Sequence, residues 1–352
     1  MRADSSLVRA GYRMTNKISV AMCTYNGARF VAEQMTSIAL QTRPPDELVV
    51  CDDCSTDATT EIVREFASRA PFPVRLHVNA KNLGSTRNFE QAVRLSAGDI
   101  IALSDQDDVW MPEKLERIEA RFSARPNLGL VFTDAEIVDE ELRPLGYRLW
   151  DRVSLGKAER RLLKSGRALD VLLPGWTVTG ATAAFRAKFR DLFLEIPDDL
   201  PMIHDGWIAL IIAAVADVAF IDEPLIKYRQ HSRQQIGAPE KNPSEAEGGM
   251  SLKSIKAAAR RSNVYEELIN VASRVRQRLL ARCEAYDCQA AVERLESRLT
   301  HMRARASLPQ HKFRRLGCVA RELFARRYHL YSRGFHSALK DILFGGTHHP
   351  SA

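Results

Sequence analysis

The chain has 352 residues, of which 45% are hydrophobic and 27% are charged, a composition that supports a sizeable folded core. Its longest apolar stretch, residues 207–216, has about half the length that a bilayer span needs, and residues 1–17 lack the apolar core of a signal peptide. We therefore expect a cytoplasmic protein, neither exported nor integral, and six cysteines in so long a chain predict no disulfide framework.

The net charge of +7 is unevenly distributed along the chain. Residues 240–352 contain 21 Lys and Arg against 11 Asp and Glu, whereas residues 1–239 contain 30 against 33. A basic C-terminal region favours an anionic partner, either a membrane surface or a nucleic acid. A solvated helix face and an oligomer interface are the alternatives. No nucleic-acid recognition motif accompanies the charge, so we expect no nucleic-acid partner.

Strands and helices alternate over the first hundred residues. We expect strands at 18–22, 47–51, 74–78 and 100–103, separated by helices at 28–40, 58–70 and 85–96. This order predicts βαβ units and an α/β fold with a mostly parallel central sheet flanked by helices. Ligands of such sheets bind at the carboxyl ends of the strands. The polar loops 24–27, 52–57 and 104–108 all follow strands, so we expect them to meet.

The second half of the chain has a less regular pattern. It predicts strands at 129–134 and 218–221, a polar Arg-rich connection at 141–165, turns or a strand at 177–185, a helix at 205–215 and a loop at 228–231. The expected organisation is a flexible lead-in at 1–16, an α/β domain at 17–236, a linker at 237–252 and a helical basic region at 253–352.

Three carboxylates, Asp105, Asp107 and Asp108, follow the apolar strand at 100–103. Clustered carboxylates repel one another unless a positive group joins them, and Mg²⁺ or Mn²⁺ holding a diphosphate is a common solution. A solvated acidic turn is the alternative. Asp105 and Asp107 share one face of an extended segment. We expect Asp107 to bind the metal directly, Asp105 to contact ribose or metal-bound water, and Asp108 to be structural.

Taken in order, these motifs resemble the family 2 inverting glycosyltransferases, whose GT-A fold binds nucleotide-diphospho-sugars. The resemblance covers about residues 17–236 and is carried by the segments 20–26, 49–57, 82–88, 98–101 and 105–108. The sequences at 105–110, 204–207 and 228–231 look most like the rhamnosyltransferase-type branch, which builds bacterial surface polysaccharide such as O-antigen. Cys54 stands where the family commonly has Gly. The Gln-x-x-Arg-Trp motif of processive members is absent, which predicts the addition of one or few sugars.

The resemblance implies a donor site that takes a dTDP- or UDP-sugar. Its implied residues are Thr24, Tyr25, Asn26, Asp52, Arg87, Asp105, Gln106, Arg229 and His231. Asp52 would accept from the pyrimidine N3–H and Tyr25 would stack on the base. Arg87 would reach the diphosphate or orient the loop at 104–108, called the acidic loop below. Arg229 and His231 lie where the family carries a loop that closes over the diphosphate. A turn carboxylate, a packing aromatic and a solvated arginine are the alternatives for Asp52, Tyr25 and Arg87.

Asp205 is the candidate catalytic base, because inversion requires a group that deprotonates the acceptor hydroxyl as it attacks. The start of a helix favours its charged form, although capping that helix is an equally simple role. The residues assigned to the acceptor side are Trp176, Thr179, Gly180, His204 and Trp207. The expected acceptor is a saccharide or a lipid-linked sugar.

We expect a peripheral position on the inner face of the cell membrane, reached through the basic C-terminal region. The competing hypothesis from another class is a catalytically silent sugar-nucleotide-binding or scaffold protein of a polysaccharide assembly complex. A nucleotidyltransferase is disfavoured because the loop at 24–28 lacks a basic Gly-rich motif. A dehydrogenase is disfavoured because no G-x-G-x-x-G follows the first strand.

Overall fold

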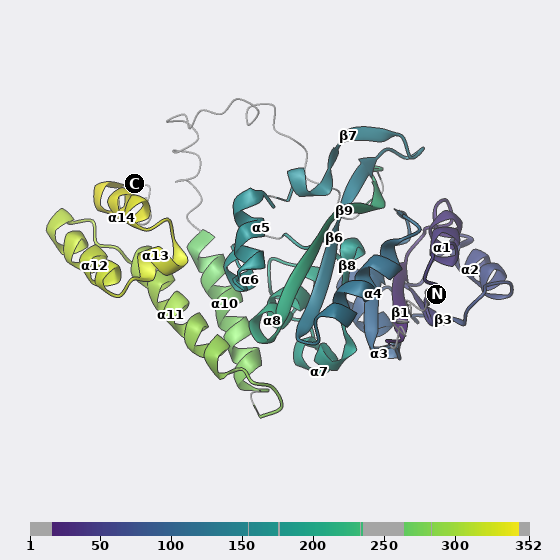
Figure 1. Cartoon of the computed structure of the whole chain (residues 1–352), viewed down its shortest axis with the longest axis horizontal. Coiled ribbons are helices and arrows are strands. Elements are labelled where there is room, and N and C mark those ends of the chain that lie inside the picture. The colour runs from purple at the N-terminus through teal and green to yellow at the C-terminus, as the bar shows by residue number, and fades with distance from the viewer. Residues whose placement is uncertain are drawn as a thin grey trace, which may run out of the picture.

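A computed structural model describes residues 16–153, 155–174, 177–232, 234, 264–282 and 284–344. A twisted nine-stranded sheet with helices on both faces forms the body, and a group of C-terminal helices extends from one end (Figure 1). The predicted lead-in and the predicted linker at 237–252 lie outside the described residues, apart from residue 16.

The first half of the body has the alternation that the sequence predicts. Its elements are β1 (Ile18–Thr24), α1 (Val31–Ala39), β2 (Glu47–Asp52), α2 (Thr59–Ala67), β3 (Val74–Val78), α3 (Ser85–Leu95) and β4 (Ile100–Ser104). The four strands pair in parallel in the order β3-β2-β1-β4. All seven residues of β1 are buried, as expected of a central strand covered by helices on both faces.

The second half adds antiparallel pairs and so makes the sheet mixed. Its strands are β5 (Val109–Trp110), β6 (Leu128–Val138), β7 (Pro144–Arg148), β8 (Ala183–Arg186) and β9 (Asp217–Arg229), and its α-helices are α4 (Lys114–Ala124), α5 (Lys157–Lys164), α6 (Ala168–Leu172), α7 (Arg190–Phe193) and α8 (His204–Val215). β6 pairs in parallel with β9, whereas β8 runs antiparallel to both β4 and β6. Residues 228 and 229, predicted as loop, are the last residues of β9, because pairing with β6 continues to the end of both strands.

Alternate residues of the strands face two different cores. In β1, Ala21 and Cys23 belong to the core under α3, α6, α7 and α8, whereas Val20 and Met22 belong to the core under α1, α2 and α4. This period of two is what strand geometry requires when both faces are covered. α8 is apolar on nearly all sides, so it lies buried inside the first core.

The C-terminal helices fall into two groups. They are α10 (Val264–Leu280), α11 (Gln289–Ala306), α12 (Lys312–Phe324), α13 (Arg327–Tyr331) and α14 (Phe335–Phe344). Buried residues of α10 and α11 join the same core as α8, whereas α12 to α14 have a small core of their own around Val319, Tyr328 and Ala338. The second group lies at the end of the molecule opposite α1 and α2 (Figure 1). No helix among the described residues combines the length and apolar character needed to cross a bilayer.

Candidate functional site

The three polar loops that were expected to meet do meet, at the carboxyl ends of β1, β2 and β4. The Gln106 side chain accepts from the backbone N–H of Tyr25 at 2.8 Å and donates to the carbonyl of the same residue at 3.0 Å. The N–H of Asn26 donates to Ser55 Oγ at 2.8 Å, and Asn26 Oδ1 accepts from the N–H of Thr56 at 2.9 Å. The first loop is therefore bonded to both of the others, although each comes from a different βα unit.

Gly27 allows the acidic loop to approach the first loop this closely. A Cβ atom at this position would lie 2.0 Å from Oε1 of Gln106, well inside van der Waals contact. The Gln106 side chain occupies that space and bonds the backbone of Tyr25, two residues before Gly27. The close packing of the two loops therefore depends on the missing side chain of Gly27.

The second loop is held by its two aspartates. Asp52 is fully buried and accepts from Thr24 Oγ1 at 2.8 Å, from the N–H of Ser55 at 2.8 Å and from its hydroxyl at 2.6 Å. Its contact with a nucleotide base stays a prediction, because Oδ1 can accept one more hydrogen bond but the side chain is fully buried. Asp53 accepts from the N–H groups of Leu83 and Gly84 at 2.7 and 2.8 Å, which is a structural role.

The acidic loop concentrates negative charge that the protein only partly compensates. Burial, followed by the nearby charges of Asp107 and Asp205, raises the pKa of Asp105 to about 7. Burial and the same loop's charges raise the pKa of Asp108, whose Oδ1 accepts from the N–H of Arg229 at 3.1 Å. Asp108 Oδ2 is buried without a hydrogen-bond partner among the described residues. The arrangement favours the arrival of a cation.

Lys114 places a buried amine beneath this loop, and the sequence argument did not single it out. Its side chain is fully buried at the start of α4, and Nζ donates to the carbonyl of Ala181 at 2.7 Å while lying 3.5 Å from the centre of the Trp110 ring. Burial lowers the pKa of Lys114, and the charges of Asp108 and Asp105 oppose this effect. A lysine just inside a helix is too common a pattern to have revealed this position.

His231 and Arg229 reach the acidic loop from the end of β9. Nε2 of His231 lies 2.8 Å from Oδ2 of Asp107, and its ring packs against Phe30 with centroids 4.8 Å apart. Arg229 has only 2% of its side chain exposed and donates through Nε to the carbonyl of Asp107 at 2.7 Å. Its other guanidinium nitrogens bond the carbonyl of Glu140 and the carboxylate of Glu33.

The predicted phosphate contact of Arg229 is therefore corrected to a positioning role. Each of its three side-chain nitrogens bonds a protein oxygen, and only 2% of the side chain is exposed, so the guanidinium faces the protein interior. Arg87 has a different environment from the one predicted, because it pairs with Glu90 and Asp198, both at 2.6 Å, rather than with the acidic loop. Its side chain remains 36% exposed, so its contact with a diphosphate stays a prediction.

The donor atoms of the acidic loop fit a Mg²⁺ or Mn²⁺ ion shared with a phosphorylated substrate. Among the residues that the structure describes, no three His, Cys, Asp or Glu side chains form a metal cage. Hard ions of this kind are commonly held by one or two carboxylates and completed by substrate phosphates and water. Asp107 and Asp105 supply such carboxylates, and His231 lies beside the first of them.

Asp205 stands in the first turn of α8 on the other side of this region. Its Oδ2 accepts from the N–H of Gly180 at 2.8 Å, and its Oδ1 accepts from the N–H of Gly206 at 2.6 Å. The next residue after Gly180 is Ala181, whose carbonyl receives Lys114 Nζ. Asp205 and Lys114 thus hold neighbouring residues of one short turn, which brings the base candidate and the acidic loop together.

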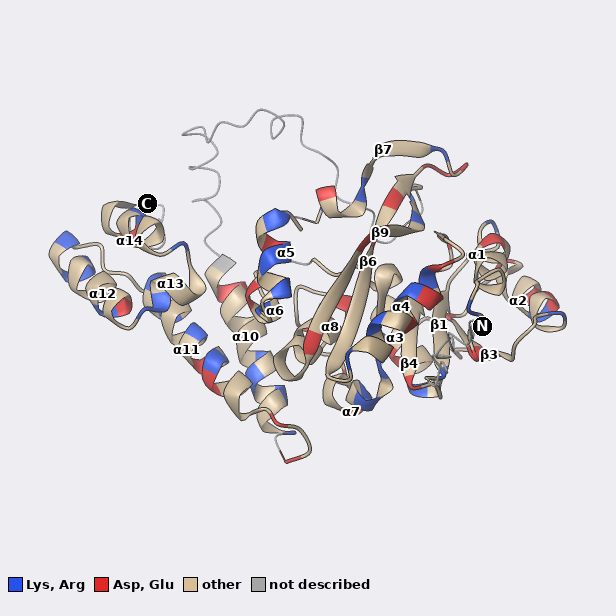
Figure 2. Ribbon diagram, viewed as in Figure 1, with Lys and Arg blue, Asp and Glu red and all other residues tan. Residues whose placement is uncertain are grey.

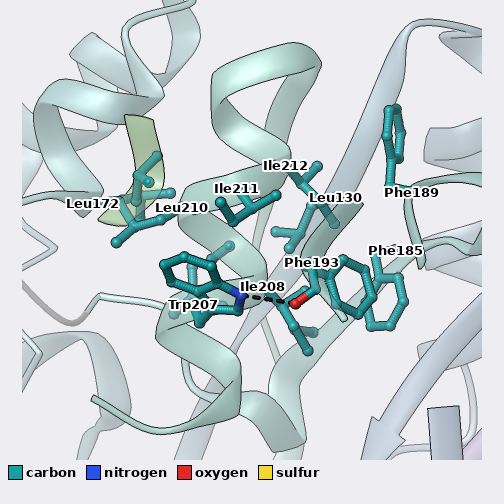
Figure 3. Close-up of a cluster of buried hydrophobic side chains, with 14 of the residues drawn as sticks. Leu130, Leu172, Phe185, Phe189, Phe193, Trp207, Ile208, Leu210, Ile211 and Ile212 are labelled. Atoms are coloured by element: carbon teal, nitrogen blue, oxygen red, sulfur yellow. Dashed lines mark hydrogen bonds between the residues drawn. The ribbon is translucent and has the colours of Figure 1, made fainter. Parts of the chain in front are cut away.

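Of the residues assigned to the acceptor side, Gly180 and Thr179 lie in this turn, next to Asp205. His204 is buried and stacks on Phe89 with ring centroids 4.0 Å apart, and burial lowers its pKa. Trp207 is corrected to a core residue, because it is 1% exposed, packs among apolar side chains of α8 and donates to the carbonyl of Phe193 at 2.8 Å (Figure 3). Trp176 lies outside the described residues.

Comparison with known families identifies the class of protein to which this fold and site belong. The model of the family described as Glycosyl transferase family 2 matches residues 19–196, which include β1 from its second residue, β2 to β4 and the acidic loop. The chain therefore belongs to glycosyl transferase family 2.

Individual relatives agree with this assignment. An uncharacterised glycosyltransferase of Nostoc sp. is 28% identical over 218 residues, which are 61% of this chain and 65% of that protein. A glucosyltransferase of Escherichia coli, named for the transfer of glucose from UDP-Glc to α-D-GlcNAc-diphosphoundecaprenol, is 32% identical over 122 residues, 35% of this chain and 47% of that protein. The chain matches less than two thirds of the length of such relatives.

Solved structures support the fold. Staphylococcus aureus TarS, crystallised with UDP-GlcNAc, aligns with a TM-score of 0.52 over 90% of this chain and 84% of that chain. Sequence identity is 16%, so the similarity concerns the fold alone. The predicted GT-A architecture, with a central sheet flanked by helices and additional C-terminal helices, is confirmed.

Proposed function

We propose that this protein is an inverting glycosyltransferase that moves a sugar from a UDP- or dTDP-sugar to a hydroxyl group of a saccharide or lipid-linked acceptor. Family membership supports glycosyl transfer. The single observation that carries the proposal is the convergence of Asp205 and the acidic loop, because Asp205 bonds the N–H of Gly180 while Lys114, beneath the loop, bonds the carbonyl of the next residue, Ala181. One carboxylate group is thus available for the acceptor and another for the donor.

In the proposed reaction Asp205 takes the proton of the acceptor hydroxyl while its oxygen attacks the anomeric carbon from the face opposite the diphosphate. The new carbon–oxygen bond forms as the bond to the diphosphate oxygen breaks, which inverts the configuration and releases the nucleoside diphosphate. The N–H groups of Gly180 and Gly206 hold Asp205 in place through its two oxygens. A positioned carboxylate base contributes about 10²–10⁴ to the rate of such a step.

Asp107 and Asp105 would hold a Mg²⁺ or Mn²⁺ ion, with His231 beside Asp107. Such an ion supplies positive charge opposite the charge that develops on the departing diphosphate. Arg229 fixes the backbone of Asp107 from behind, and Gln106 fixes the loop to Tyr25, so the acidic loop is organised before the donor arrives.

The recognition of the nucleotide base and the choice of acceptor are proposed on separate grounds. Tyr25 lies in the first loop and is 49% exposed, which suits stacking on a pyrimidine, while Thr24 and Asn26 hold the same loop through their hydrogen bonds. The E. coli relative is named for an acceptor linked to undecaprenol through a diphosphate, which supports a lipid-linked acceptor. Rhamnose remains one of the donor sugars to test.

An Asp205→Asn variant tests the proposal. The full chain is incubated with Mn²⁺ and a panel of UDP- and dTDP-sugars, together with saccharide and polyprenyl-diphosphate-linked acceptors, and release of nucleoside diphosphate is measured. We expect the turnover rate of the variant to fall about 10²–10⁴-fold, while its affinity for nucleoside diphosphate equals that of the unaltered protein. Asp217→Asn, an exposed aspartate at the start of β9, is the matched control.

Two results would contradict the proposal in different ways. Full turnover by the Asp205→Asn variant would remove Asp205 from the role of base. Tight binding of nucleoside diphosphate without turnover by the unaltered protein, across the whole panel, would favour the silent sugar-nucleotide-binding alternative.

A further inference from the structure

The outer faces of α12 and α14 carry large apolar side chains that nothing in the described structure covers. Phe324 is 89% exposed, Phe313 is 82% exposed and Phe335 is 71% exposed. Leu316, Leu330, Leu339 and Leu343 are each about half exposed, at 49%, 49%, 57% and 57%. Single exposed apolar residues are ordinary on protein surfaces, but seven of them between residues 313 and 343 are a concentration that calls for an interaction partner.

The helical spacing gathers these side chains into stripes. In α14, residues 335, 339 and 343 recur every four positions and so lie on one face. In α12, residues 313, 316 and 324 lie on one face, whereas the buried residues of the same helix, Arg315, Val319 and Glu322, lie on the opposite side. The apolar stripes therefore face outward by the geometry of helices whose other sides pack inward.

The charges on the same helices are almost entirely positive. Residues 312–344 contain eight Lys and Arg and two carboxylates, Glu322 and Asp341. Both carboxylates are buried, Glu322 in contact with His301 and Arg327 and Asp341 in contact with Arg305 and Tyr328. In the described part of α12 to α14, every exposed charged side chain is therefore basic: Lys312, Arg314, Arg321, Arg326, Arg333 and Lys340. Figure 2 shows Lys and Arg residues in blue along α12 and α13.

From this combination we infer that the outer face of α12 to α14 docks on an anionic lipid bilayer. Phenylalanine and leucine side chains enter the boundary of the acyl chains, while lysine and arginine pair with acidic headgroups. A second copy of the chain would place like charges opposite one another. A nucleic acid would neutralise the charge but leave the aliphatic side chains of α14 in water. Only a surface that is both apolar and acidic matches both properties.

The helices that carry the proposed docking surface are attached to the α/β body through α11. Arg305 of α11 donates to both oxygens of Asp341 in α14, at 2.6 and 3.0 Å, and α11 itself packs into the core that contains α8. A lipid-linked acceptor, one of those proposed above, resides in such a bilayer. The inference extends the proposed function, but binding to vesicles can be measured without any sugar transfer.

Flotation of the full chain with lipid vesicles tests the inference. We expect the protein to float with vesicles of phosphatidylcholine and phosphatidylglycerol, and much less with phosphatidylcholine alone or at high salt. Arg314→Glu with Arg321→Glu should weaken binding to the anionic vesicles by about tenfold or more, because two cations attracted by the acidic headgroups are replaced by two anions that the headgroups repel. Phe324→Ser with Phe335→Ser should weaken it by a similar factor through lost insertion.

Matched controls separate docking from general changes of charge or hydrophobicity. Arg121→Glu with Arg125→Glu makes the same charge change at exposed positions of α4 and its end, and Leu40→Ser removes a 68% exposed apolar side chain after α1. These variants should float like the unaltered protein, and all variants should retain its circular dichroism.

Three results would overturn the inference. The unaltered protein could fail to float with anionic vesicles, or the α12 and α14 variants could float as well as the controls. Light scattering could also show that Phe324→Ser with Phe335→Ser converts an oligomer to a monomer while flotation is unchanged, which would assign the patch to a second copy of the chain.

Discussion

Nε2 of His231 lies 2.8 Å from Oδ2 of Asp107, although 124 residues of sequence separate the two. The contact joins the end of β9 to the loop after β4, the two segments that would enclose the diphosphate of a donor. We propose Asp107 as a metal ligand. His231 could hold the Asp107 carboxylate in place or bind the metal beside it. The pair therefore gives a direct way to test the metal site.

Removing either side chain should weaken metal-dependent nucleotide binding. For His231→Ala and Asp107→Asn we expect the affinity for UDP in the presence of Mn²⁺ to fall by about 10–100-fold, the range typical of changes around a bound metal. Binding of UDP after chelation of the metal should differ little between the variants and the unaltered protein. Isothermal titration calorimetry measures both.

His77→Gln, which changes an exposed histidine of β3, is the control for this experiment. Equal Mn²⁺-dependent affinity for UDP in the unaltered protein, His231→Ala and Asp107→Asn would exclude the proposed metal site.

Gly27 and Gln106 should be energetically coupled. Gly27→Ala places a Cβ atom where Gln106 Oε1 now lies, so we expect a loss of about 1–3 kcal/mol in the free energy of unfolding and weaker donor binding. Gln106→Ala alone loses two hydrogen bonds to Tyr25, worth about 1 kcal/mol each. The double variant should be more stable than the sum of the two losses predicts, because the clash disappears with the glutamine. Urea unfolding of the four proteins measures the coupling, and strict additivity would contradict it.

Cys54 occupies a backbone conformation that suits glycine. Its φ is +66°, in the left-handed region where an L-residue with a Cβ atom costs roughly 1–2 kcal/mol. The glycine common at this position in the family therefore has a conformational reason. We expect Cys54→Gly to stabilise the protein by about 0.5–1 kcal/mol, after the greater chain entropy of glycine in the unfolded state is counted.

The matched control is Cys318→Gly in the middle of α12. Glycine inside a helix should destabilise the protein by about 1 kcal/mol. Thermal unfolding by circular dichroism compares the two variants, and a loss of stability on Cys54→Gly would show that the thiol contributes more than its backbone strain costs.

Acid should weaken the attachment of α12 to α11. Burial lowers the pKa of His301 despite its contact with Glu322. Burial alone would raise the pKa of Glu322, but the hydrogen bonds from Arg327 and His301 outweigh it and hold this pKa below its usual value. Both pKa values are depressed in the folded protein, so the unfolded chain binds more protons as the pH falls, and stability is lost. The loss should begin below about pH 6.5 for His301 and continue below about pH 4.5 for Glu322.

Urea unfolding followed by circular dichroism at a series of pH values tests this dependence. His301→Gln should flatten the part of the curve between about pH 5 and 6.5, because glutamine takes up no proton. His336→Gln, an exposed histidine on α14, should leave the curve unchanged. Parallel curves for the His301→Gln variant and the unaltered protein would contradict the assignment.

Much of this protein was predictable from local sequence. The apolar runs of β1, β2 and β4 and the helices between them follow from side-chain periodicity, and the position of loops at strand ends follows from the topology of parallel sheets. The meeting of the loops containing Asn26, Ser55 and Gln106 was therefore expected and is observed. The resemblance to glycosyl transferase family 2 was likewise carried by short, ordered motifs.

Other features were decided by tertiary structure alone. Arg229 is buried behind the acidic loop because β9 continues past the expected strand end and pairs fully with β6, and Trp207 faces the core because α8 is covered on all sides. Lys114 beneath the acidic loop and the buried carboxylates Glu322 and Asp341 depend on contacts between distant segments. Periodicity specifies which face of an element is apolar, but the partner of a polar side chain is set by how the elements pack against one another.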